Sequence, residues 1–371
     1  MTERVLEGRG KVIIMLLDGF GYKLLEQAVR MGEQTAFSHM AELETVDPLT
    51  TTFPSTTATA LSSVNTGRTP LEHGIIGYTS YLKEFGLVAN MINFSPAVDR
   101  RQNVLTNLGL DLKNFLGVET IYEMLARAGY RSTVITRSFY KNSALSKMLH
   151  RGATIRTFAN SSDLFVSLRK HLEKDPDSQE FIFVYWEGLD TSAHAYGPFS
   201  DEVFAELRGL SFYLHTEVMQ RLERKAAKNS ALLITGDHGL AEVTRDETIT
   251  TSEHPEIMNC LQIPPTGDAR AVFLNTKPGH TGALQKILFK LLEDEIRIIS
   301  TKDVIHNGLL GSGRVPSKIL DRIGNLLALP LGRRAIVHPY RNRGTDSFMK
   351  GSHGGMSDNE IFVPLIGSRF N

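Results

Sequence analysis

The sequence predicts an α/β fold in which a mostly parallel central sheet is covered by helices on both faces and a small cap is inserted late in the chain. Three observations lead to this prediction. Short apolar runs recur along the chain, segments of helical periodicity separate them, and one long region before the C-terminus shows neither pattern.

The predicted strands are short apolar runs, each bounded by charged or turn residues. They lie at 12–17, 132–136, 181–186, 231–235 and 361–366. An uninterrupted apolar run is typical of a strand that is buried on both faces, because alternate side chains point to opposite sides of the sheet.

Helices are predicted between these strands. The segments 118–128, 163–172 and 202–225 have apolar residues at helical spacing. Strands that alternate with helices indicate parallel pairing, since a parallel connection needs a crossover that can hold a helix.

The pattern changes between residues 241 and 345, where shorter elements alternate with turn clusters such as 263–268 and 275–280. We therefore divide the chain into a discontinuous α/β core, residues 1–240 and 346–371, and an inserted cap, residues 241–345.

The balance of charged residues disfavours strongly anionic binding partners. The chain has 371 residues, with 41 Lys and Arg against 41 Asp and Glu, so a nucleic acid as obligatory partner and an anionic membrane are disfavoured. The single Cys260 forms no internal disulfide and is predicted to be buried. No apolar run reaches the roughly 18 residues of a membrane-spanning helix. We expect a cytoplasmic protein, and the sequence does not indicate its oligomeric state.

Carboxylates follow three of the predicted strands. Asp18 ends the first run, Asp190 follows the run at 181–186, and Asp237 follows the run at 231–235. Ligands bind at the carboxyl ends of the strands in an open parallel sheet. One such Asp is more often a capping or turn residue, but three in equivalent positions are hard to explain by capping.

Histidines accompany these carboxylates. His194 follows Asp190 by four residues, so both can face one ion from a helical turn, and His238 is adjacent to Asp237. His353 lies in a Gly-rich turn, where a His is more often a surface residue, but here it completes a set. Three Asp and three His can hold two divalent ions, either zinc or manganese. Paired metals are typical of phosphoryl-transfer chemistry.

The nucleophile is expected in the Thr-rich segment 48–75. A Thr/Ser-rich loop also caps helices. Both roles are compatible, because free N–H groups at a helix N-terminus can receive phosphate.

Taken in order, these motifs resemble the alkaline phosphatase superfamily, and within it the type I phosphodiesterase/nucleotide pyrophosphatase family. The motifs are LLDG, FPSTT followed by TGRTPLEHGI, D-x-x-x-H, GDHG and SHGG. The resemblance covers most of the core. It implies an alkaline-phosphatase-like three-layer sandwich with a catalytic core, a cap that sets substrate specificity, and a Thr, Ser or formylglycine nucleophile between two metal ions.

Two alignments of the nucleophile motif are open. TTFP at 51–54 makes Thr52 the nucleophile but needs five extra residues before TGRTP. The gapless alternative matches the family's Tyr-Pro-Thr-Lys-Thr to residues 53–57 and keeps the following motif in register. We therefore predict Thr57 as the nucleophile, with Thr52 and Thr56 as alternatives to exclude.

The same resemblance implies the ligand sets. One metal takes Asp18, Thr57, Asp237 and His238, and the other takes Asp190, His194 and His353. His73 lies outside both sets, and we interpret it as a structural residue or one that supports a ligand.

At several positions the sequence differs from the motifs of the family or of its superfamily, and these differences bear on the class of substrate. Tyr78 stands where phosphodiesterases place an Asn that binds a phosphate oxygen, and its hydroxyl can donate one hydrogen bond. Cys260 lies outside any sulfatase motif, and Leu61 occupies the position of that motif's Arg. A phosphomonoesterase usually has a guanidinium clamp for the dianion, which Arg270 of the cap could supply.

We therefore expect a two-metal phosphodiesterase or nucleotide pyrophosphatase that acts on a small phosphodiester or nucleotide-like molecule through a covalent phospho-Thr intermediate. The alternatives are a phosphomonoesterase or phosphonate hydrolase of the same superfamily. A mutase is disfavoured because its larger cap is hard to fit. A non-catalytic metal-binding protein is disfavoured by the intact ligand set with a Thr at the nucleophile position.

Overall fold

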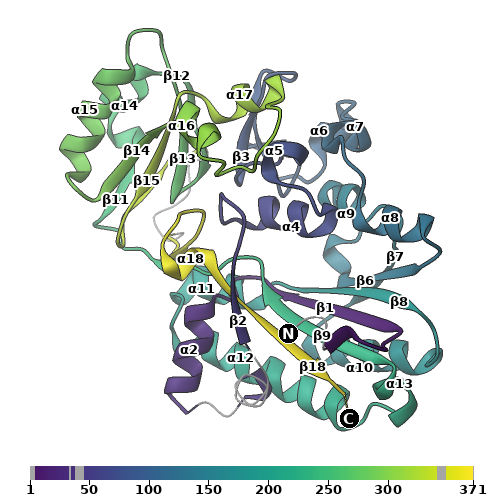
Figure 1. Cartoon of the computed structure of the whole chain (residues 1–371). Helices are drawn as coiled ribbons and strands as arrows, with labels where there is room; N and C mark the ends of the chain where they lie inside the picture. The colour runs from purple at the N-terminus through teal and green to yellow at the C-terminus, as the bar shows by residue number, and fades with distance from the viewer. Residues whose placement is uncertain (1–4, 33–34, 38–45, 341–347, 371) are drawn as a thin grey trace.

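The computed structural model describes residues 5–32, 35–37, 46–340 and 348–370 of the chain. It contains two seven-stranded sheets (Figure 1). Two further sheets have two strands each. In one, β10 (Ala241–Glu242) pairs with β17 (Gly351–Ser352), and in the other, β11 (Thr248–Thr250) pairs with β16 (Ala335–Val337).

The first sheet has the order β2-β18-β9-β1-β8-β6-β7. Its strands are β1 (Lys11–Leu17), β2 (Val46–Thr50), β6 (Arg131–Arg137), β7 (Thr154–Phe158), β8 (Glu180–Trp186), β9 (Ser230–Gly236) and β18 (Phe362–Arg369). The strands from β9 to β7 are parallel, and β18 is antiparallel to both of its neighbours. The mostly parallel sheet is thus confirmed, and all five predicted runs are strands in it.

Two edge strands of this sheet, β2 and β7, were not predicted. Their side chains are largely exposed, with the sequences VDPLT and TIRTF. An edge strand needs no continuous apolar run, because only part of its surface meets the core.

Helices cover both faces of the first sheet. In β1, Ile13 and Met15 pack on one side, and Leu16 packs on the other. The first side is covered by α2 (Tyr22–Arg30), α10 (Ser161–Lys174), α12 (Asp201–Tyr213) and α13 (Arg224–Lys228), and the second by α4 (Thr57–Thr66), α8 (Ile121–Arg127) and α9 (Ala144–Leu149). This is the predicted three-layer arrangement. The periodic segment 202–225 is interrupted, because α12 passes into a π-helical turn, Leu214–Met219, before α13.

The second sheet has the order β14-β15-β13-β12-β3-β4-β5, and its neighbours are all antiparallel. Its strands are β3 (Thr79–Leu82), β4 (Leu87–Asn90), β5 (Ser95–Pro96), β12 (Leu261–Asp268), β13 (Ala271–Thr276), β14 (Ile296–Ser300) and β15 (Leu326–Pro330). Three of these strands lie within residues 79–96, outside the predicted cap. The division at 241 and 345 remains a prediction, and we call residues 241–345 the cap below.

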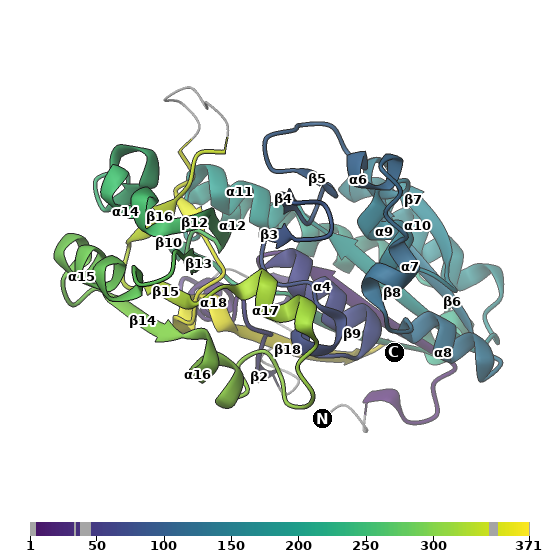
Figure 2. The ribbon, with the colours of Figure 1, turned by 90° about the horizontal axis from the view of Figure 1, so that it is seen from above.

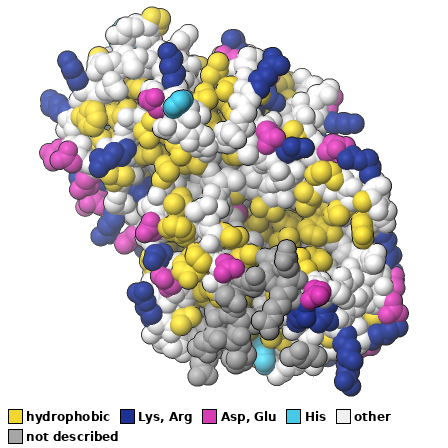
Figure 3. All heavy atoms as spheres, in the orientation of Figure 1, with side chains coloured by type: hydrophobic (Ala, Val, Ile, Leu, Met, Phe, Trp, Pro, Cys, Tyr) yellow, Lys and Arg dark blue, Asp and Glu magenta, His cyan; other side chains and the backbone are white. Residues whose placement is uncertain are grey.

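The remaining helices flank the two sheets, as Figure 2 shows from above. They are α5 (Pro70–His73), α6 (Val104–Asn107), α7 (Leu112–Leu116), α11 (Gly188–Tyr196), α14 (Pro255–Cys260), α15 (Thr281–Leu292), α16 (Thr301–His306), α17 (Ser317–Ile323) and α18 (Asp358–Ile361). Cys260 is buried, as predicted. Within the described ranges, none of the helices is both long and apolar enough to cross a membrane. Acidic and basic side chains are interspersed over the face seen in Figure 3.

Candidate active site and metal centre

The first ligand group forms where β1 and β9 end. Asp18 directly follows β1, and Asp237 and His238 directly follow β9; all three are buried. His238 Nε2 lies 3.4 Å from Asp18 Oδ1 and 3.6 Å from Asp237 Oδ2. Because the two strands are parallel neighbours, these side chains reach the same edge of the sheet.

Gly19 allows the backbone of Asp190 to lie close to the end of β1. Its φ is +76°, and a Cβ there would lie 3.0 Å from the Cα of Asp190. The glycine lets the chain leave β1 while the start of α11 approaches closely, and the Asp190 N–H donates to the Asp18 carbonyl oxygen over 3.0 Å.

The second ligand group comes from α11 and the turn after β17. Asp190 and His194 lie one turn apart on α11, with Asp190 Oδ1 3.3 Å from His194 Nε2. His353 Nε2 lies 3.9 Å from the same oxygen. The Gly351 carbonyl lies 2.7 Å from His194 Nδ1, which orients that ring with Nε2 toward the carboxylate. In each group the ligand-type atoms lie within 4.8 Å of one another.

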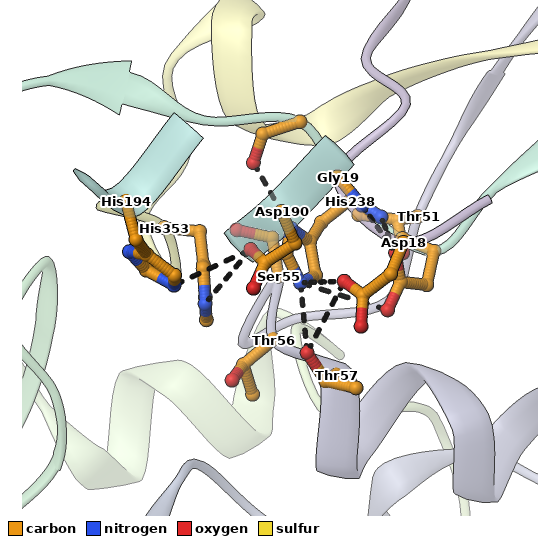
Figure 4. A network of polar contacts seen from close by, with 12 residues as sticks. Asp18, Gly19, Thr51, Ser55, Thr56, Thr57, Asp190, His194, His238 and His353 are labelled. Atoms are coloured by element: carbon orange, nitrogen blue, oxygen red, sulfur yellow. Dashed lines mark hydrogen bonds and ion pairs between the residues drawn. The ribbon is translucent and has the colours of Figure 1, made fainter. Parts of the chain in front are cut away.

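The Thr57 hydroxyl lies against the first group (Figure 4). Thr57 is the first residue of α4, and its Oγ1 is 3.1 Å from His238 Nε2 and 3.5 Å from Asp18 Oδ1. The two groups adjoin through stacked rings, since the centroids of His238 and His353 are 4.0 Å apart. The seven side chains that the family resemblance implied are thus brought together.

The electrostatics of the site favour cations. Burial, followed by repulsion from Asp237 and Asp190, raises the pKa of Asp18 well above its usual range. Burial also raises the pKa of Asp237 and lowers the pKa of His353 well below 6.5. Asp237 Oδ2 and Asp190 Oδ1 have no hydrogen-bond partner among the described residues. Crowded carboxylates with oxygens that accept no hydrogen bond from the described part of the chain, beside imidazole rings, fit the donor set of two divalent ions.

The other two threonines considered as nucleophile are placed differently. The Thr56 hydroxyl donates to Asp268 over 2.9 Å. Thr52 Oγ1 is buried without a hydrogen-bond partner among the described residues. Of the three hydroxyls, that of Thr57 is the one in contact with the ligand groups.

His73 and Tyr78 lie near the nucleophile segment but outside the ligand groups. His73 is fully buried, with Nε2 2.9 Å from the Ser63 hydroxyl and Nδ1 accepting from the Ile75 N–H. Burial lowers its pKa to about 3, in keeping with a neutral structural residue. Tyr78 is 40% exposed and lines the pocket described below.

Arg270 is engaged away from the ligand groups. The residue is 1% exposed, and its guanidinium donates to Glu360 and to the carbonyl oxygens of Gly332 and Arg334. The suggestion that it supplies an anion clamp is therefore wrong, because a buried carboxylate already holds it.

Two further residues of the site, Tyr185 and Asp268, were not predicted from the sequence. The Tyr185 hydroxyl donates to Asp18 Oδ2, and burial raises its pKa well above the usual range. Asp268 ends β12 in the cap, and burial raises its pKa to about 7. A Tyr one residue before the end of the apolar run that precedes Asp190 was a usable signal. Asp268 lay in a cluster that was interpreted only as a turn.

A pocket of about 720 Å³ opens from the ligand groups, with walls from both the core and the cap. One wall consists of uncharged residues around α9 and the β4–β5 segment, including Ile92, Ala97, Leu145 and Leu149. A single phosphate needs far less space, so the pocket has room for an organic substituent.

The sequence matches the family model of type I phosphodiesterase/nucleotide pyrophosphatase over residues 12–356. The chain belongs to this family. Members are phosphoric ester hydrolases, so the enzyme class expected from the motifs is confirmed. No curated protein matches the sequence.

Solved structures share the fold of this phosphodiesterase-family chain. Murine ectonucleotide pyrophosphatase/phosphodiesterase 5 is 17% identical, with a TM-score of 0.70 over 96% of this chain and 87% of its own. An inactive variant of that murine protein, solved in complex with AMP, aligns with the same values. Phosphonoacetate hydrolase from Sinorhizobium meliloti 1021, in complex with phosphonoformate, is 18% identical, with a TM-score of 0.66 over 97% and 90% of the two chains.

Proposed function

We propose that this chain is a two-metal phosphodiesterase that uses Thr57 as its nucleophile. The observation that supports this most directly is the Thr57 hydroxyl, 3.1 Å from His238 Nε2 and adjacent to two groups of Asp and His side chains. Asp18, Thr57, Asp237 and His238 would hold one ion, and Asp190, His194 and His353 the other. Zinc suits these ligands best, and manganese is the alternative.

When bound, the two ions neutralise charge on the phosphate oxygens and lower the pKa of the Thr57 hydroxyl and of water. Thr57 Oγ1 forms a bond to phosphorus as the bond between phosphorus and the leaving oxygen breaks, and the leaving group departs as an alcohol or phosphate. Water then cleaves the phospho-Thr bond and restores the hydroxyl. The chain's own contribution is to hold Thr57 at the start of α4, where free N–H groups also attract phosphate oxygens.

Two features favour a diester. The uncharged wall around Leu145 and Leu149 suits an organic substituent better than a phosphate oxygen. Arg270, the guanidinium first considered for a dianionic monoester, is bound to Glu360. A small phosphodiester or nucleotide-like molecule is therefore the proposed substrate.

The direct test uses metal-stripped protein reloaded separately with zinc and with manganese. Hydrolysis of bis-p-nitrophenyl phosphate is compared with that of p-nitrophenyl phosphate and of thymidine 5′-p-nitrophenyl phosphate. We expect a higher kcat/KM for the diesters. A preference for the monoester would move the function to a phosphomonoesterase.

The fold that this chain shares with phosphonoacetate hydrolase supports the alternative that it hydrolyses a phosphonate. Release of inorganic phosphate from phosphonoacetate tests it under the same metal conditions. Phosphate release without diester hydrolysis would favour that alternative.

A further inference from the structure

Asp268 lies outside the two ligand groups but contacts the segment that carries the nucleophile. It is the last residue of β12, so it belongs to the second sheet, yet its side chain reaches the nucleophile segment and lines the active-site pocket.

Both carboxylate oxygens of Asp268 hold residues near the nucleophile. Oδ1 accepts a hydrogen bond from the Thr56 hydroxyl over 2.9 Å, and Oδ2 accepts one from the backbone N–H of Tyr78 over 3.2 Å. Thr56 is the N-cap of α4, but its hydroxyl caps no helical N–H. The hydroxyl that usually satisfies a helix N-terminus is therefore used to tie the nucleophile segment to the cap.

Asp268 also touches the turn that carries His353. A Cβ added to Gly354 would lie only 2.5 Å from Asp268 Cβ, so this glycine permits the approach. Gly354 in turn exchanges hydrogen bonds with Ser55, whose N–H donates to the Gly354 carbonyl and whose hydroxyl accepts from the Gly354 N–H. The segments at 55–57 and 353–354 thus meet at Asp268.

A rigid support holds Asp268 in this place. Two residues further on, Arg270 forms a buried ion pair with Glu360 of α18, with Nη2 3.0 Å from Oε2. Glu360 also accepts from the Gly355 N–H over 2.8 Å. The turn after β12 is therefore fixed to the core.

We propose that Asp268 is a positioning residue that orients the Thr56–Thr57 peptide so that the Thr57 hydroxyl faces the reacting phosphorus. The proposal rests on the proposed function, because it takes Thr57 as the nucleophile. It gives the cap a part in catalysis besides its predicted part in specificity.

The kinetic test compares Asp268→Ala, Asp268→Asn and Thr56→Val in metal-loaded full-length protein with bis-p-nitrophenyl phosphate. We expect Asp268→Ala to lower kcat about tenfold to a hundredfold, since a displacement of about 1 Å has effects of that size, while KM and metal content change little. Asp268→Asn should recover part of kcat, because its amide oxygen can still accept from Thr56. The exposed cap carboxylate Asp294, changed to Ala, is the matched control.

The link between the two residues is tested with the double variant. Thr56→Val combined with Asp268→Ala should lose no more kcat than Asp268→Ala alone, because both changes break one connection. If the loss of kcat in the double variant equalled the product of the two single losses, the proposal would be overturned. An unchanged kcat in a folded, metal-loaded Asp268→Ala would overturn it as well. Loss of metal in that variant would also overturn it and assign Asp268 to the metal centre.

Crystal structures of the metal-loaded wild type and Asp268→Ala give a readout without turnover. A Thr57 hydroxyl displaced relative to His238 supports the positioning role, and an unchanged hydroxyl overturns it. If the wild type hydrolyses none of the esters, the proposed function fails, and this structural comparison still decides the role of Asp268.

Discussion

The imidazole of His238 stacks on that of His353, with ring centroids 4.0 Å apart. His238 follows β9, and His353 arrives through the turn after β17, so the contact joins the two ligand groups. Burial, followed by repulsion from His238 and His194, lowers the pKa of His353 well below its usual value, so the ring of His353 is held neutral. Neutral imidazole is the form that binds metal.

The first prediction concerns Thr57. Thr57→Ala should lower kcat by at least about a thousandfold, because it removes the attacking oxygen, while the six Asp and His ligands keep both metals. Turnover of bis-p-nitrophenyl phosphate and metal content by mass spectrometry are measured together. Thr52→Ala is the control and should keep near wild-type activity. Activity retained in Thr57→Ala but lost in Thr52→Ala would move the nucleophile.

The second prediction concerns Tyr185, whose hydroxyl donates to Asp18. Tyr185→Phe keeps the partly buried ring but removes the donor that orients this ligand, so metal affinity or kcat should fall about tenfold to a hundredfold. Titration with a competing chelator measures the affinity. Tyr213→Phe is the control, because Tyr213 stacks on Phe165 in the opposite helical layer. Equal metal affinities together with equal kcat values in the two variants would show that the Tyr185 hydroxyl does not orient the ligand.

The sequence was sufficient to predict the parts of the fold and site that local patterns determine. Asp18 and Asp237 follow runs whose strand character is visible in their apolar composition, and parallel strands bring their ends to one edge. The edge strands β2 and β7 lack that pattern because they are mostly exposed.

Asp268 could not be predicted for a different reason. Its partners Thr56 and Tyr78 lie 212 and 190 residues away along the chain, next to α4 and β3. No spacing rule relates positions so distant, and the contact exists only because β12 pairs with β3 through Gly267 and Thr79. Arg270 is similar, since nothing near it in the sequence indicates Glu360 as its partner.

The third prediction concerns pH. The pKa of Asp18 lies well above its ordinary value of 3.8, chiefly because of burial, so the metal-free folded protein holds a proton that the unfolded chain releases. The free energy of unfolding of the metal-free protein should therefore fall as pH rises above about 4. Bound cations replace that proton, so the Tm gained on metal loading should be larger at pH 8 than at pH 5.

Thermal unfolding in chelator and in manganese, at several pH values, measures this difference. Asp18→Asn is the control, because its amide does not titrate and should flatten the pH dependence of the metal-free protein. A metal effect on Tm that stays constant or shrinks as pH rises would contradict the prediction.

The fourth prediction concerns the ion pair between Arg270 and Glu360, which are 1% and 0% exposed. Arg270→Met should lower the free energy of unfolding by about 3–5 kcal/mol, because it leaves a buried carboxylate without its counter-charge. Arg270→Met with Glu360→Gln should recover part of the loss, since the Gln side chain carries no charge and keeps an oxygen for the Gly355 N–H. Urea unfolding measures both.

The matched control for this pair is Arg333→Met, which breaks an ion pair with Glu242 between two half-exposed side chains. Its cost should stay below about 1 kcal/mol, because water screens the charges. Gly355 lies two residues after His353, so Arg270→Met should also weaken metal binding, whereas Arg333→Met should not. If both variants lost the same stability and kept the same metal affinity, the Arg270–Glu360 pair would have no special part in holding the cap and the His353 turn together.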